Sequence, residues 1–174
     1  MPLIKNGAVV DDRYVTVSDD GDLPAGAVAV MVTAARFMAD PAALLAREAP
    51  VGVIWPNNKN VAALEPFLDR LAAVALVFPN FRDGRAYSQA RILRERFGFG
   101  GELRATGEVL RDQFVFFVRA GFDALAVAKP EDAEAFAAAL ARYSVFYQPT
   151  GASRTAASRL RAERLEGGPR SSAA

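Results

Sequence analysis

The chain has 174 residues, of which 52% are hydrophobic and 24% are charged, as is typical of one globular domain with a sizeable core. Its 21 basic residues nearly balance 20 acidic ones, so the net charge gives no reason to expect binding to nucleic acid or to a membrane surface. The absence of Cys and His excludes disulfides, a catalytic thiol, a histidine base and the usual ligands of zinc, haem and iron–sulfur clusters.

No apolar run approaches the roughly 18 residues that a membrane span requires. We therefore expect a cytoplasmic protein. The remaining acid–base groups have ordinary pKa values far from neutrality, so catalysis at pH 7 would need a strong environmental shift. The composition thus lowers the expectation of an enzyme, and it predicts no bound metal or cofactor.

The first 25 residues predict a small β-hairpin flap. Two short apolar strands between Leu3 and Val10 flank Asn6-Gly7, a dipeptide suited to the positive φ angles of a tight turn. Residues 13–17 are a third candidate strand, and a polar segment at residues 19–24 follows it. We expect the main α/β domain to occupy residues 26–148.

Within that domain, short runs rich in Val and Ala alternate with helical segments, which is typical of βα units that build a parallel sheet. The pattern predicts about five parallel strands, either in an open sheet with helices on both faces or in a partial barrel. The predicted strands are AVAVMVTA, VGVIWP, AVALVFP, GELRATG and DALAVA.

Apolar spacing and capping residues predict the helices. Asp40 followed by Pro41 is typical of a helix start. Apolar residues three and four apart predict further helices within residues 61–71, 84–98, 110–121 and 130–140. Val115 and Phe116 lie off the apolar stripe of their helix, which is apolar nearly all round; burial of this helix between neighbours is the favoured interpretation, and contact with another protein is the alternative.

After Gln148 the chain is rich in small residues and Arg. This composition predicts a disordered tail at residues 149–174.

Polar side chains follow several of the predicted strands at their carboxyl ends, where ligands bind in open parallel sheets. The turn Asp83-Gly84-Arg85 opens a helix and places a carboxylate beside a guanidinium suited to an oxyanion. An ion pair between Arg85 and Asp83 or Glu108 is an equally weighted alternative. The candidates for binding an anion or a partner are Asp83, Arg85, Ser88, Gln89, Arg91, Glu108, Arg111, Asp112 and Gln113.

Structural explanations exist for several of these candidates. Glu108 suits a helix start because the helix dipole favours acidic residues there, and Gln113 is expected to be partly buried and hydrogen-bonded to the 83–85 turn. Tyr87, Arg91 and Arg94 share a predicted helix flank that suits either docking or solvation. The sequence contains no P-loop and no dinucleotide fingerprint.

The run FPNFRDGRAYSQARILRERFGFGGELRATGEVLRDQ, followed by AGFDALAV, resembles the bacterial domain-of-unknown-function family 934. The resemblance extends from about Val51 to Leu140. Members of that family occur beside genes of sulfite reductase and of assimilatory sulfate reduction and are labelled as oxidoreductases of sulfite reduction. The resemblance therefore implies a role in sulfur assimilation and supplies no catalytic residues.

Since the chain has no Cys or His, we expect an accessory protein that binds sulfite reductase, another sulfate-assimilation enzyme or an anionic intermediate through the Arg-rich strand ends. A small oxidoreductase with a non-covalent cofactor is one alternative. A structural α/β module without a ligand is the other.

Overall fold

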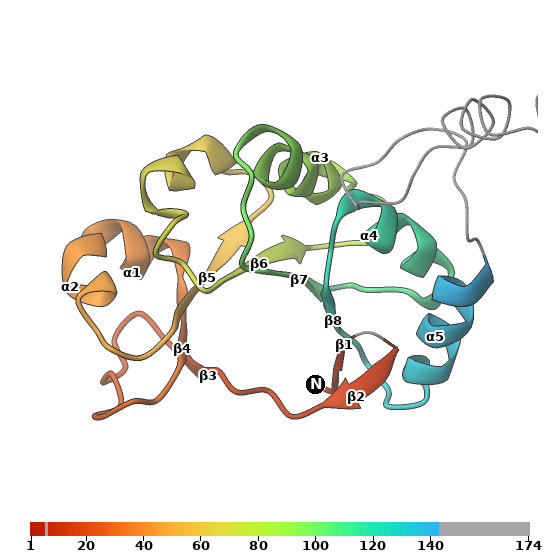
Figure 1. Ribbon diagram of the computed structural model, residues 1–174, viewed down its shortest axis with the longest axis horizontal. Coiled ribbons are helices and arrows are strands. Elements are labelled where there is room, and N and C mark those ends of the chain that lie inside the picture. Colours follow the sequence, from red (N-terminus) through yellow and green to blue (C-terminus); the bar gives the residue numbers. More distant parts are fainter. Residues whose placement is uncertain (6, 143–174) are drawn as a thin grey trace, which may run out of the picture.

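The computed structural model describes residues 1–5 and 7–142, which form a curled eight-stranded sheet with helices along its convex side (Figure 1). The strand order is β2-β1-β8-β7-β6-β5-β4-β3. Strands β3 to β8 are parallel, whereas β1 runs antiparallel to both β2 and β8. The strands are β1 (Leu3–Lys5), β2 (Ala8–Val10), β3 (Val15–Val17), β4 (Val30–Thr33), β5 (Val51–Pro56), β6 (Ala73–Phe78), β7 (Glu102–Gly107) and β8 (Ala124–Ala126).

The helices follow the strands in alternation. Asp40 caps α2 as its sequence predicts, because its Oδ1 accepts a hydrogen bond of 2.9 Å from the backbone N–H of Ala43. The helical elements are α1 (Ala34–Ala39), α2 (Pro41–Leu45), the 3₁₀ helix η1 (Val61–Phe67), α3 (Arg85–Arg91), the π-helical turn η2 (Ile92–Arg96), the 3₁₀ turn η3 (Arg111–Gln113), α4 (Phe114–Ala120) and α5 (Asp132–Arg142).

The two faces of the sheet carry different side chains because strand residues alternate in direction. Val53, Leu76 and Leu103 are fully buried in the large core cluster that includes the helices. The opposite, concave face carries smaller residues such as Ala73 and Ala75, which pack in a separate cluster with Tyr14. The core between sheet and helices therefore lies on the convex side.

The predicted alternation of parallel strands and helices is confirmed, and so is the hairpin pairing of β1 with β2. The parallel part of the sheet has one strand more than expected, because β3 pairs with β4. Among the described residues, the alternative with helices on both faces is wrong, since the helices line the convex side (Figure 1). Asn6 and the predicted tail at residues 149–174 lie outside the described residues.

The expected burial of the residues off the α4 stripe is wrong for Phe116, whereas Val115 is half-buried. The Phe116 side chain is 57% exposed, whereas its neighbours Phe114 and Phe117 are fully buried. The reason is that α4 packs one stripe against the core and turns Phe116 away from it. None of the described helices is long and apolar enough to cross a membrane.

Candidate functional site

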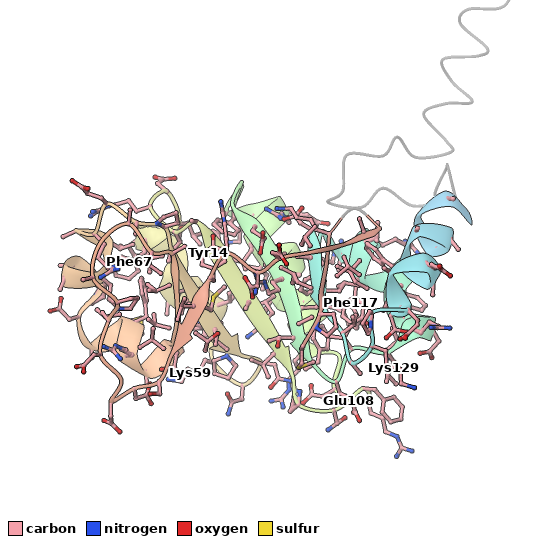
Figure 2. The ribbon with its side chains drawn as sticks, turned by 90° about the horizontal axis from the view of Figure 1, so that it is seen from below. Tyr14, Lys59, Phe67, Glu108, Phe117 and Lys129 are labelled. Carbon is pink, nitrogen blue, oxygen red and sulfur yellow. The ribbon has the colours of Figure 1, made fainter. Side chains whose placement is uncertain are left out.

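The loops that leave the carboxyl ends of β5 to β8 meet along one edge of the molecule. Figure 2 shows Lys59, Glu108 and Lys129 along this edge, each from a different loop. Parallel strands bring their carboxyl ends to the same side, so residues far apart in sequence become neighbours. We call this surface the carboxyl-end rim; it comprises residues 57–59, 80–85, 108–113 and 129–132.

Asp83 and Arg85 form an ion pair on the rim. Arg85 Nη2 lies 2.5 Å from Asp83 Oδ2, and Arg85 Nε donates to Asp83 Oδ1 over 2.9 Å. The hydrogen bond from the Arg85 side chain is the main reason that the pKa of Asp83 lies well below its ordinary value, and the backbone N–H of Arg85 and the Asn57 side chain add to it. The ion-pair alternative for Arg85 is therefore the observed one.

Glu108 and Gln113 both hold the backbone of Phe81. The N–H of Phe81 donates to Glu108 Oε2 over 2.6 Å, and Gln113 Nε2 donates to the Phe81 carbonyl over 3.1 Å. Gln113 is half-buried, as expected. Its hydrogen bond goes to Phe81, however, and not to the turn at residues 83–85. These two side chains therefore fix the β6–α3 loop from the side of β7.

Gln89 and Arg111 tie further loops together. Gln89 is buried, and its Nε2 donates to the carbonyls of Lys59 (2.8 Å) and Pro56 (3.3 Å). Arg111 pairs with Asp132 over 2.9 Å and thereby joins the loops after β7 and β8. Both contacts stabilise loop geometry and use donors that a ligand would otherwise take.

The remaining candidates face elsewhere or act indirectly. Ser88 and Arg91 line a shallow outer groove on α3 and η2, where Arg91 pairs with Glu95 over 3.1 Å. Asp112 is exposed; burial raises the pKa of Tyr87 to about 12, and the charge of Asp112 adds to that rise. Of the nine candidates, Asp83, Arg85, Gln89, Glu108, Arg111 and Gln113 take part in the contacts between and within the rim loops.

The predicted flank of Tyr87, Arg91 and Arg94 is not one surface. Tyr87 packs in an aromatic cluster, with ring centroids 4.9 Å from Phe78 and 5.1 Å from Phe117. Arg94 donates instead to carbonyls of neighbouring loops. Arg94 lies within the π-helical turn η2, in which the N–H of Phe97 donates to the carbonyl of Ile92, so it does not continue the α-helical phase of Tyr87 and Arg91.

The outward surface of the rim combines an exposed aromatic side chain with cations. Phe81 is 42% exposed, and the Arg82 guanidinium lies 5.3 Å from its ring centroid. Within the part of the chain that the structure describes, Arg82, Lys59 and Lys129 make no ion pair. The rim also carries three carboxylates that make no ion pair among the described residues, Glu108, Asp112 and Glu131, so that its positive and negative charges are equal in number.

A second polar cluster, which sequence reasoning missed, lies on the concave face. The Arg104 side chain is only 7% exposed and pairs with Asp12 over 2.5 Å and with Glu102 over 2.8 Å. Lys5 pairs with Glu102 over 3.0 Å, and the Arg104 guanidinium lies 5.4 Å from the Tyr14 ring centroid. The strand GELRATG carries the signal: two opposite charges, two residues apart, point to the same face of a strand.

Burial and pairing act in opposite directions on these groups. Burial by itself raises the pKa of Glu102 and of Asp12, but hydrogen bonds from Arg104, joined by Lys5 on Glu102, hold both pKa values below their ordinary range. Burial lowers the pKa of Arg104, and the two carboxylates reverse that effect. All of these groups are therefore ionised at neutral pH.

The described residues contain no group of three or more carboxylates positioned to hold a metal ion. A model of the family described as bacterial protein of unknown function, DUF934, matches residues 52–158, which is more than half of the chain. The chain belongs to DUF934. The DUF934 match includes the rim loops after β5, β6 and β7 as well as Arg104, and it leaves out Asp12 and Tyr14. No match to the chain was found among curated proteins.

Proposed function

We propose that this DUF934 protein is an accessory protein of assimilatory sulfate and sulfite reduction, and that its carboxyl-end rim docks on sulfite reductase or on another enzyme of the pathway. The pathway comes from the sequence resemblance, which the rim motifs DGRAYSQAR and GEVLRDQ carry. The docking surface comes from the geometry of the rim.

The observation that supports docking best is the pair formed by Phe81 and Arg82. An exposed aromatic ring with a guanidinium over it is the kind of anchor that dominates binding energy at protein interfaces. Glu108 and Gln113 already hold the backbone of Phe81, so that little conformational entropy is lost when a partner binds. Lys59 and Lys129 make no ion pair of their own among the described residues, so they can pair with carboxylates of a partner.

The rim suits a protein partner better than a small anionic intermediate. A sulfur oxyanion at Arg85 would have to replace Asp83, and one at Arg111 would have to replace Asp132. Phe81 and the cations beside it offer a partner apolar contact and charge together, which a small anion cannot use. The geometry of the rim therefore favours docking of a protein over binding of a small anion.

A structural α/β module without a ligand is the second candidate, because the bonds of Gln89, Glu108 and Gln113 explain most polar rim residues without any partner. Charge reversal at Arg85 and at Arg111 separates the two. Loss of partner binding with an unchanged circular dichroism spectrum supports a binding surface, whereas loss of folding supports a purely structural network.

The small oxidoreductase is tested by the absorbance spectrum of the purified protein. A flavin-loaded preparation would favour it over the accessory role. A cavity on the concave face of the sheet is the feature of the fold that supports this alternative.

The proposal is tested by affinity capture from sulfate-grown cells of the source bacterium. We expect sulfite reductase to co-purify with the wild-type protein but not with Arg82→Glu. Arg96→Glu is the matched control, because Arg96 is also exposed but lies at the end of η2 that leads to the start of β7. No association, together with normal sulfite reduction in a deletion strain, would contradict the proposal.

A further inference from the structure

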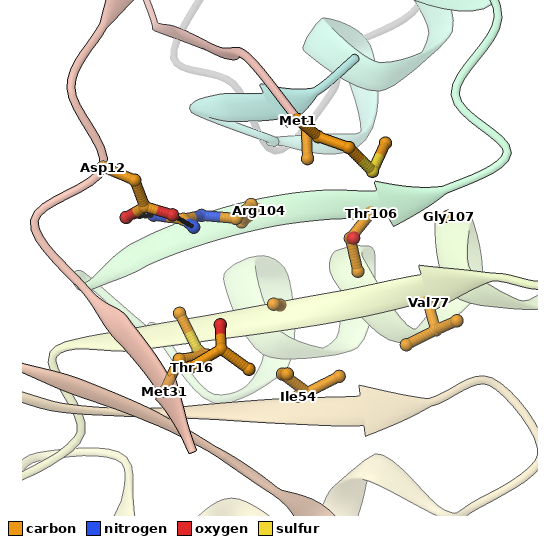
Figure 3. A pocket seen from close by; sticks show the side chains of 11 residues that line it. Met1, Asp12, Thr16, Met31, Ile54, Val77, Arg104, Thr106 and Gly107 are labelled. Carbon is orange, nitrogen blue, oxygen red and sulfur yellow. Dashed lines mark hydrogen bonds and ion pairs between the residues drawn. The ribbon is translucent and has the colours of Figure 1, made fainter. Parts of the chain in front are cut away.

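The concave face of the sheet forms a cavity of about 390 Å³ (Figure 3). Its walls come from all six parallel strands, including Thr16 of β3, Met31 of β4, Ile54 of β5, Val77 of β6 and Thr106 of β7. Small-molecule sites in proteins commonly have volumes of roughly 300 to 1,000 Å³. The cavity therefore has the size of a ligand site, and its lining residues Met31 and Ala75 belong to the cluster on the concave face, opposite the core under the helices.

Small side chains on the inward strand positions create this space. Ala75 and Ala126 line the cavity. In closed barrels of parallel strands, the inward strand positions carry bulky Val, Ile and Leu instead, and these fill the interior. The two faces of β6 show the contrast, since Leu76 and Phe78 are buried among the helices while Ala75 and Val77 face the cavity. The sheet thus has a packed convex face and an underfilled concave face.

The side-chain charges at the cavity wall are paired with one another, and the amino terminus of Met1, which also lines the cavity, adds a positive charge that acts on Asp12. Figure 3 shows Asp12 and Arg104 side by side at one end of the cavity. The two positive charges of Arg104 and Lys5 match the two negative charges of Asp12 and Glu102, to which they are paired. An anionic ligand that bound Arg104 would therefore have to displace the Asp12 carboxylate or lie close to it.

Hydrogen-bond donors nevertheless remain. Arg104 makes four hydrogen bonds to Asp12 and Glu102, one from Nε, two from Nη2 and one from Nη1, and so one Nη1–H is left. The Thr16 and Thr106 hydroxyls make no hydrogen bond within residues 1–5 and 7–142. The apolar walls and these few donors define one ligand chemistry: an apolar body with an uncharged acceptor group.

We propose that the concave cavity binds an uncharged, mostly apolar organic molecule whose carbonyl or hydroxyl oxygen accepts a hydrogen bond from the Thr106 hydroxyl. This site is separate from the carboxyl-end rim. It does not depend on the docking function, so that failure of one proposal leaves the other standing.

Fluorescence titration with two dyes of similar size tests the proposal. The probes are Prodan, a neutral naphthyl ketone, and anilinonaphthalene sulfonate, which carries a negative charge. We expect Prodan to bind at one saturable site with a blue-shifted emission and about tenfold more tightly than the sulfonate. Thr106→Val removes the hydroxyl at constant shape and should weaken Prodan about tenfold, whereas Thr106→Ser should leave its affinity unchanged.

Two further variants locate the bound dye. Val77→Phe extends a half-buried wall residue into the cavity and should weaken Prodan tenfold or more. Phe116→Ala removes an exposed ring outside the cavity lining and should have no effect. Unfolding by heat confirms that each variant is folded, and the isosteric Thr106→Val keeps the test decisive if Val77→Phe does not fold.

Three results would overturn the proposal. One is the absence of saturable Prodan binding. Another is an affinity that neither Thr106→Val nor Val77→Phe changes, since the dye would then lie elsewhere. The third is tighter binding of the sulfonate that the same variants abolish, because the site would then select an anion.

Discussion

Gly107 lies at the end of β7, and any other amino acid at this position would strain the backbone. Its φ angle is +93°, and a Cβ atom there would lie 2.3 Å from the carbonyl oxygen of Phe78. The same carbonyl accepts a hydrogen bond of 2.8 Å from the N–H of Glu108. The close approach of two backbones thus positions Glu108, which in turn holds Phe81 on the rim.

We predict that Gly107→Ala destabilises the protein more than Gly98→Ala does. Gly98 also has a positive φ, +66°, but a Cβ there meets open space. The backbone conformation alone costs about 1–3 kcal/mol in either variant, and the contact with Phe78 adds about 1 kcal/mol or more at Gly107. Urea unfolding of the two variants measures the difference, and equal losses would refute the close contact.

The buried carboxylate of Glu102 makes stability depend on pH. Because its folded-state pKa is lowered, its contribution is fully present above its ordinary pKa of about 4 and is lost as the pH falls through the lowered value. We therefore expect the free energy of unfolding to decline below about pH 4.

Glu102→Gln should flatten that decline and cost about 3 kcal/mol at pH 7, because it leaves Arg104 with one carboxylate fewer. Denaturant unfolding between neutral and acidic pH measures both effects. Glu131→Gln, at an exposed carboxylate, is the control and should change neither. An unchanged pH profile in Glu102→Gln would show that the ion pair contributes nothing.

At the scale of elements, Arg94 joins η2 to the loops that precede β7 and β8. Its Nε donates to the Gly121 carbonyl over 3.0 Å, its Nη1 donates to the Gly101 carbonyl over 2.9 Å, and it pairs with Asp123. The side chain is 13% exposed. One guanidinium therefore fixes the amino-terminal edge of the sheet, opposite the rim.

Arg94→Lys should lower the free energy of unfolding by about 2 kcal/mol or more, since an ammonium cannot reach three separate acceptors in the same geometry. Arg91→Lys is the matched control on the same helical stretch. Its exposed ion pair with Glu95 should contribute only about 0.5 kcal/mol. Thermal or urea unfolding compares them; similar losses in the two variants would contradict the role given to Arg94.

The alternation of elements was predictable from the sequence, and the faces on which they lie were not. Val and Ala runs predicted β4 to β8, and Asp40-Pro41 predicted the start of α2, because both signals are local. The π-helical turn at 92–96 depends on tertiary packing, so that the expected flank through Arg94 was wrong. Phe116 could not be placed from the sequence either. Residue spacing identifies the apolar stripe of a helix, but it does not show whether another element covers the remaining helix surface.

The candidate site was predictable to a similar degree. Parallel topology implied that the loops after β5, β6 and β7 would meet, and residues such as Gln89 and Gln113 do connect them. The partners of Arg85 and Arg111 required coordinates, because either could have faced a ligand. The cluster around Arg104 was missed because Asp12 and Lys5 come from the hairpin region, far from β7 in sequence.

At the scale of the whole molecule, the curled sheet has two functional surfaces of different character. The rim presents Phe81 among exposed charges of both signs, and the concave cavity presents apolar walls with paired side-chain charges. The first suits a protein partner, whose recognition depends on ionic strength, and the second suits a neutral molecule. Salt should therefore weaken binding at the rim and leave dye binding in the cavity nearly unchanged.

Binding of the purified protein to immobilised sulfite reductase, measured as a function of salt concentration, tests the central claim most directly. We expect saturable binding whose association rate falls as salt rises, a tenfold or greater loss of affinity in Arg82→Glu and in Phe81→Ala, and no change in Arg96→Glu. Absence of binding at low salt, or binding that is the same in all four proteins, would contradict the assignment of the rim as a docking surface.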